Sequence, residues 1–86
     1  MPSLSAEILA LKALTFLAQS QDELERFVAL AGIGPADLRS RADDPELLAA
    51  VIDFILADDR RLTSFCESLG LEPKAIHLAR RALPGA

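Results

Sequence analysis

The sequence contains no tryptophan, tyrosine or asparagine, and only two valines and five isoleucines among its 86 residues. The β-branched and aromatic residues that strands favour are therefore scarce. Leucine and alanine, which favour helices, supply 31 of the 86 residues. A hydrophobic fraction of 51% argues against disorder, and the length leaves room for one domain. We therefore expect a single all-α domain over residues 1–86, a compact bundle of five or six short helices.

Other scarcities limit where the protein works. A single cysteine, Cys66, cannot form an internal disulfide, which favours a reducing, cytoplasmic location. No stretch reaches the roughly 20 apolar residues of a transmembrane helix, and no basic region precedes an apolar run as in a secretory signal. Acidic residues outnumber basic ones by 13 to nine, so the net charge is −4. We expect no membrane association, and this charge disfavours nucleic acid as a partner.

Caps, prolines and glycines mark the expected helices. Ser3 or Ser5 can cap the first helix. Ser20 and Glu23 form a capping box, in which the Ser20 hydroxyl accepts the Glu23 amide and the Glu23 carboxylate reaches back. The first expected helix ends at about Ala18. The others run from the Ser20 cap to Ala31, from Pro35 to Ala42, from Pro45 to Ala57, from the Asp58 or Asp59 cap to before Gly70, and from Pro73 to near Leu83.

Two of these helices are broadly apolar. The fourth is apolar nearly all round, so we expect it to be buried on most sides. In the first helix, Leu9 and Phe16 lie off the main apolar stripe. We place both helices at the centre, and any apolar surface left over is a dimer patch. The main stripe of the first helix consists of Leu4, Ile8, Leu11, Leu14, and Leu17 or Ala18.

The chain also matches itself at an offset of 38 residues. The matched positions are core, cap and turn residues, which a repeated structural unit must keep. The pattern favours two copies of a three-helix unit, 7–42 and 45–80, packed face to face about a pseudo-two-fold axis. The identical pairs are Leu9 and Leu47, Phe16 and Phe54, Leu24 and Leu62, Phe27 and Phe65, Gly32 and Gly70, and Pro35 and Pro73.

The turn Gly32-Ile33-Gly34-Pro35 is similar to the hairpin of helix-hairpin-helix DNA-binding modules. In such turns, glycines let backbone amides approach a phosphate. The corresponding turn in the second half carries Glu72, which would repel a phosphate. We therefore favour the simpler interpretation, a C-cap followed by a helix that begins at proline.

The adjacent cations Arg60 and Arg61 lie near a helix start, where the helix dipole does not favour them. A solvated face is the favoured interpretation. The alternative is pairing with Asp58, with Asp59 or with a partner protein. Together with Gly32 and Gly34, these two arginines are the candidate interaction residues.

The remaining polar candidates are interpreted as structural. His77, the single histidine, is expected at the surface, and Cys66 in the core. Asp53 interrupts an apolar helix, but its counterpart Thr15 is also polar, so we expect this position to face water in both halves. No set of acid, base and nucleophile can be assembled from these residues. We expect no catalytic residues, no cofactor and no metal site.

Several stretches resemble a known family. They are 11–18, 26–30, 44–58 and the motif Phe-x4-Gly-Ile-x-Pro-x-Asp-Leu-Arg over 27–39, which is the most specific. Residues 69–73 and 79–85 also match. The chain is similar to the small alphaproteobacterial family catalogued as domain of unknown function 3572. The resemblance covers nearly the whole chain and implies a bacterial, cytoplasmic protein. It carries over no activity, cofactor or catalytic residue.

These observations favour a small, non-catalytic protein-interaction module, not an enzyme. Its partner is an unidentified protein, and a second copy of the chain is one candidate because the apolar fraction is high. The alternative is a nucleic-acid-binding module that uses the turn at residues 32–35.

Overall fold

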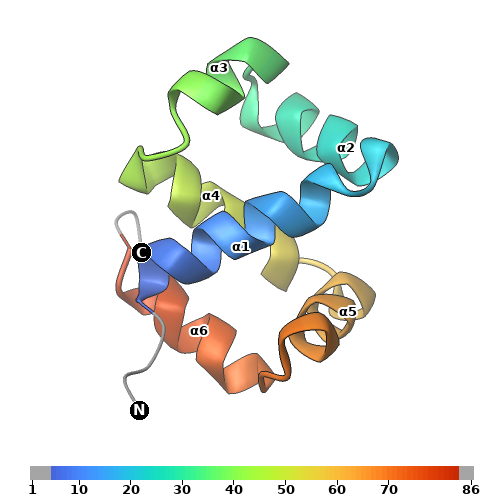
Figure 1. Cartoon of the computed structure of the whole chain (residues 1–86), viewed down its shortest axis with the longest axis vertical. Helices are drawn as coiled ribbons and strands as arrows, with labels where there is room; N and C mark the ends of the chain where they lie inside the picture. Colours follow the sequence, from blue (N-terminus) through green and yellow to red (C-terminus); the bar gives the residue numbers. More distant parts are fainter. Residues whose placement is uncertain (1–4, 84–86) are drawn as a thin grey trace.

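The computed structural model describes residues 5–83, apart from the side chain of Pro35. Over this range the chain is helical, without strands, which confirms the all-α prediction (Figure 1). The helices are α1 (Ala6–Ala18), α2 (Gln21–Ala31), α3 (Pro35–Ser40), α4 (Pro45–Leu56), α5 (Asp59–Leu69) and α6 (Pro73–Arg81).

Helices α1 and α5 begin where capping side chains satisfy free backbone amides, whereas α3 and α6 begin at prolines without a side-chain cap bond. Ser5 Oγ accepts from the Ile8 amide at 3.1 Å, and Asp58 Oδ1 accepts from the Arg60 and Arg61 amides at 2.8 and 3.2 Å. These bonds favour the charged carboxylate and hold the pKa of Asp58 below its usual value. Ser5 and Asp58 are therefore the caps of α1 and α5, while Ser3 lies outside the described residues.

The ends of α2 and α5 confirm the glycine prediction. Gly32 and Gly70 adopt the left-handed conformation, with φ of 71° and 67°. Helices α3 and α6 each end two residues earlier than predicted. After α3 the chain turns at once into α4, and an ion pair of 2.8 Å between Arg41 and Asp44 spans this turn.

The core forms where α1 crosses α4 (Figure 1). Helix α4 is buried on most sides, as predicted. The stripe predicted for α1 is wrong in part: Leu17 is fully buried, but Ile8 and Leu11 face outward. Ala10 and Ala13 are instead fully buried, and their small side chains allow α1 to approach its neighbours closely. Leu4, the first member of that stripe, lies outside the described residues. The buried face of α1 consists of Leu9, Ala10, Ala13 and Leu17.

Two phenylalanine pairs join the first three helices to the last three. Phe16 on α1 contacts Phe65 on α5 with ring centroids 5.3 Å apart and planes inclined at 58°. Phe27 on α2 contacts Phe54 on α4 at 5.5 Å and 61°. Phe16 and Phe54 are 38 residues apart, and so are Phe27 and Phe65. The same offset therefore relates one ring pair to the other.

Helices α3 and α6, which follow the two left-handed glycines, pack differently. Helix α6 packs against both α1 and α4, whereas α3 makes no comparable contact. An ion pair of 2.6 Å between Arg80 and Asp53 ties α6 to α4, but the counterparts, Ala42 and Thr15, cannot form one. A hollow of about 430 Å³ remains between α1, α2 and α3. Leu14, which lines it, is only half-buried.

Replacing Gly32 or Gly70 by alanine tests the two left-handed caps. No atom lies within 4 Å of a Cβ at either position, so the cost comes from the backbone alone. We expect each variant to lose about 1 kcal/mol of unfolding free energy in urea denaturation. Gly34→Ala, at φ −87°, is the control and lacks this penalty. Equal losses for all three variants would contradict the explanation.

Candidate functional site

The side chain of Arg61 is buried, not solvated, which corrects the favoured sequence interpretation. Only 7% of it is exposed. Its Nε and Nη2 donate to Glu23 Oε2 at 3.2 and 3.0 Å, and its Nη1 donates to the Phe54 carbonyl at 2.8 Å. The guanidinium carbon lies 3.9 Å from the centre of the Phe54 ring. Arg61 therefore joins α5 to α2 and α4.

The capping box at Ser20 is formed only in part, because Glu23 pairs with Arg61. The Ser20 hydroxyl accepts from the Glu23 amide at 3.5 Å, a long contact. The Ser20 amide donates to the Leu17 carbonyl at 3.0 Å, so the Glu23 carboxylate does not reach back. A fork of guanidinium donors stabilises that carboxylate more strongly than a backbone amide would. The sequence signal for this pair was its spacing, since Glu23 and Arg61 are 38 residues apart.

Arg60 differs from its neighbour because its side chain is exposed. Its backbone amide donates to Asp58 Oδ1 at 2.8 Å, which is a capping bond and not the side-chain pairing that the sequence alternative proposed. The side chain lines a polar hollow of about 460 Å³. Glu23, Asp58 and Ser64 also line this hollow. Arg60 is therefore accessible to a partner, while the charge of Arg61 is already used within the fold.

Gly32 and Gly34 do not join the two arginines in one site. Gly32 ends α2, whereas Glu23, the residue that Arg61 contacts, lies in its first turn. Nine residues of helix separate Gly32 from Glu23, which is about 14 Å. An Asp37 carboxylate oxygen lies 3.9 Å from the place of a Cβ on Gly34. This negative charge disfavours a phosphate at the turn.

The other polar candidates have structural environments. His77 is exposed on α6, as predicted. Asp53 faces water, as predicted, and pairs with Arg80. Cys66 is buried, and burial raises the pKa of its thiol, so it stays protonated at neutral pH and is a poor nucleophile. Among residues 5–83, no cluster of three or more His, Cys, Asp or Glu side chains is placed to hold a metal ion.

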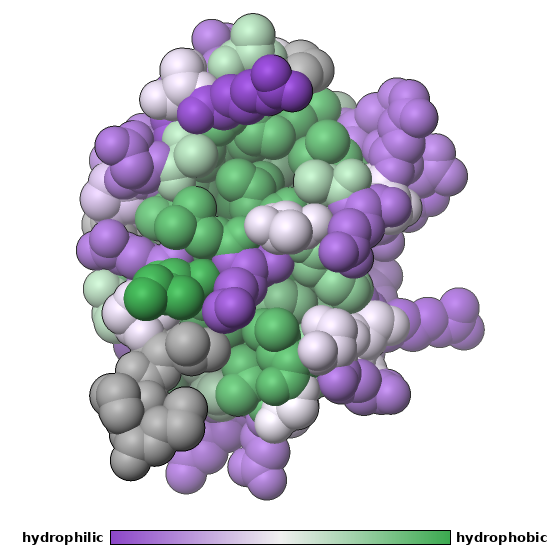
Figure 2. Space-filling view, in the orientation of Figure 1, coloured by the Kyte–Doolittle hydropathy of each residue, from purple (hydrophilic) through white to green (hydrophobic). Residues whose placement is uncertain are grey.

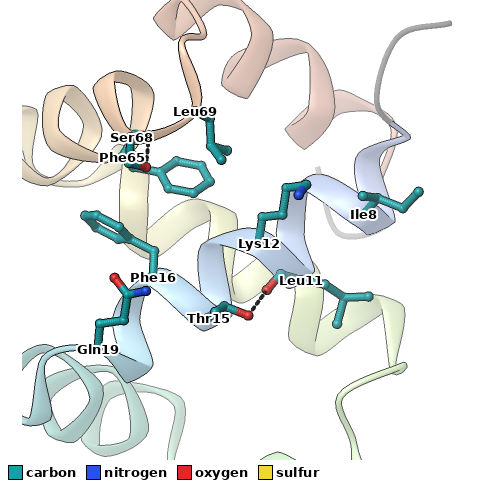
Figure 3. A pocket seen from close by; sticks show the side chains of 9 residues that line it. All are labelled: Ile8, Leu11, Lys12, Thr15, Phe16, Gln19, Phe65, Ser68 and Leu69. Atoms are coloured by element: carbon teal, nitrogen blue, oxygen red, sulfur yellow. Dashed lines mark hydrogen bonds between the residues drawn. The ribbon is translucent and has the colours of Figure 1, made fainter.

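The outward face of α1 is an apolar surface that the sequence interpretation assigned to the core. Ile8 and Leu11 are 47% and 41% exposed. They lie beside a hollow of about 430 Å³ between α1 and α5, and both extend away from Phe65 (Figure 3). In the view with α1 in front, hydrophobic side chains gather across the middle of the molecule, interrupted by charged ones (Figure 2). The outward face of α1 therefore borders the groove between α1 and α5.

A second groove corresponds to the one between α1 and α5. It has a volume of about 270 Å³ and lies between α2 and α4. Phe27 and Phe54 line it, as their counterparts Phe65 and Phe16 line the first groove. Only the groove at α1 is bordered by Ile8 and Leu11. Each groove therefore contains a phenylalanine pair, but Ile8 and Leu11 border one and Leu30 borders the other.

The fold and these surfaces define a small all-α protein with an apolar helix face beside a groove. Within the described part of the chain, no helix is long and apolar enough to cross a membrane. The sequence model of the family described as "Protein of unknown function (DUF3572)" matches residues 3–86. The chain belongs to this family, which confirms the resemblance found in the sequence. No curated protein and no solved structure matches the chain.

Replacing Arg61 by methionine tests its role in joining the helices. The variant leaves Glu23 without its ion pair and the Phe54 carbonyl without its donor. We expect a loss of about 2 kcal/mol of unfolding free energy in urea denaturation. Arg60→Met is the matched control and changes stability by less than about 0.5 kcal/mol. Similar effects of the two substitutions would contradict the distinction drawn between these neighbours.

Proposed function

We propose that the protein is a non-catalytic protein-interaction module whose contact surface is the outward face of α1. The exposure of Ile8 and Leu11 beside the groove between α1 and α5 carries this proposal. Apolar side chains gathered on one helix face, next to a concave surface, are typical of sites that receive another helix.

The environments of the polar groups support a role without catalysis. Every buried side-chain nitrogen or oxygen among the described residues has a hydrogen-bond partner. Arg61, the most deeply buried charge, is held by Glu23 and Phe54. Groups held in this way serve the fold, and they are not poised for proton transfer or nucleophilic attack. We place the protein in the cytoplasm, in keeping with its single buried thiol, Cys66.

We also propose that residues 7–42 and 45–80 are two copies of one unit, related by a pseudo-two-fold axis. The equivalent phenylalanine pairs and the equivalent left-handed glycines support this proposal. The ion pair between Glu23 and Arg61 also supports it. These residues occupy equivalent positions, and two equivalent residues can be in contact only where both lie close to the axis that relates the copies.

Truncation of equivalent rings tests the proposed duplication. Phe27 and Phe65 are both buried and occupy matching places in the two pairs. We expect Phe27→Leu and Phe65→Leu each to reduce the unfolding free energy by about 1 kcal/mol. Urea denaturation measures both losses, which agree if the surroundings are equivalent. A neutral effect at one position and a severe one at the other would count against the duplication.

Leu11→Glu tests the contact surface. Leu11 is outside the core, so the variant folds, which circular dichroism checks, while its charge opposes burial against a partner. We expect proteins captured from a bacterial lysate by the immobilised wild-type chain to be lost on Leu11→Glu. Leu78→Glu is the matched control, because Leu78 is 52% exposed on another helix, and it retains them. Capture that is insensitive to Leu11→Glu would refute the proposed surface.

A further inference from the structure

The outward face of α1 carries a heptad pattern distinct from the pattern of its buried face. Ile8, Leu11, Thr15 and Ala18 are all exposed and follow each other at spacings of three and four residues. In heptad notation they occupy positions a, d, a and d. We call these four residues the α1 ridge. A β-branched residue at a followed by leucine at d favours two-stranded pairing.

The ridge can be dehydrated at low cost. Its one polar member is Thr15, whose hydroxyl donates to the Leu11 carbonyl at 3.0 Å. The donor of Thr15 is thus satisfied within α1 itself (Figure 3). A partner that covers the ridge would leave no unpaired hydroxyl proton behind.

Opposite charges flank the ridge. Glu7 occupies position g and Lys12 position e, on the two sides of the stripe. Both are exposed, and neither forms an ion pair with any other residue in the range 5–83. In a parallel pair of helices, position g faces position e five residues further along the partner. Glu7 of each chain would then meet Lys12 of the other, and two-fold symmetry would form this pair twice.

We propose that the occupant of this face is a second copy of the chain, packed with the two α1 helices parallel and the ridges in contact. This inference rests on the proposed function and names its partner. Charge complementarity selects the orientation, because an antiparallel pair would bring each flank against the same flank of its partner. Glu7 and Lys12 would then not meet. The contact is a single helix of 13 residues, so the dimer is small and reversible.

Sedimentation of the purified chain from micromolar to millimolar concentration is the first test. We expect the mass to rise with concentration from 9.2 kDa toward twice this value. Leu11→Glu places an unpaired carboxylate in the contact, which raises the dissociation constant at least tenfold. Leu78→Glu leaves the dissociation constant unchanged. A chain that stays monomeric throughout would overturn the inference.

Charge exchange tests the predicted flanking contacts. Glu7→Lys alone replaces two attractions by two repulsions and weakens the dimer by about three- to tenfold. The double variant Glu7→Lys and Lys12→Glu restores the attractions and returns the dissociation constant to within about twofold of the wild-type value. Equal weakening by the single and double variants would refute the contact.

Disulfide trapping tests the orientation in a Cys66→Ala background. Leu11→Cys and Ala18→Cys both lie at position d, so in a parallel pair each meets its own copy and cross-links under mild oxidation. Leu78→Cys is the control and does not. Cross-linking at Leu11→Cys but not at Ala18→Cys indicates an antiparallel pair and overturns the proposal. A monomeric chain whose lysate partners still depend on Leu11 would refute the dimer and leave the proposed function standing.

Discussion

Close contact between α1 and α4 forms the centre against which α2, α5 and α6 pack. Ala10 and Ala13, both fully buried, let α1 lie close against the interior of the bundle, where α4 is enclosed on most sides. In a chain of 86 residues, a core of this kind is needed because the buried fraction of a small domain is low. Helices α2 and α5 then cover the crossing, and each contributes one phenylalanine to a ring pair. A larger residue at Ala10 or Ala13 would push α1 outward and separate Phe16 from Phe65.

Helix boundaries were predictable because the determinants are local. Ser5 and Asp58 act through side-chain bonds to amides two or three residues further along the chain. Gly32 and Gly70 act through their own backbone geometry, so none of the four needs information from distant residues. The early end of α3 was less predictable, because it depends on how soon the chain must enter α4.

The side of α1 that faces the core could not be predicted from its periodicity. Apolar residues occur on all sides of this helix, and two of the larger ones, Ile8 and Leu11, point outward. The face of α1 that packs against the core carries the small residues Ala10 and Ala13, and the spacing of apolar residues does not show which face this is. The burial of Arg61 was missed for a related reason. Its partners Glu23 and Phe54 are close only in the folded chain, whereas Asp58 is close in the sequence.

Under the proposed duplication, the ion pair between Glu23 and Arg61 has a consequence for the origin of the chain. Had two separate, identical units associated about an exact two-fold axis, the residue on the axis would meet itself. Two carboxylates or two guanidinium groups would then share one poorly hydrated place, at a considerable electrostatic cost. Joining the units in one polypeptide removes this restriction, because each position can change without its counterpart. Opposite charges at matching positions are thus available to a fused chain and unavailable to a homodimer of its halves.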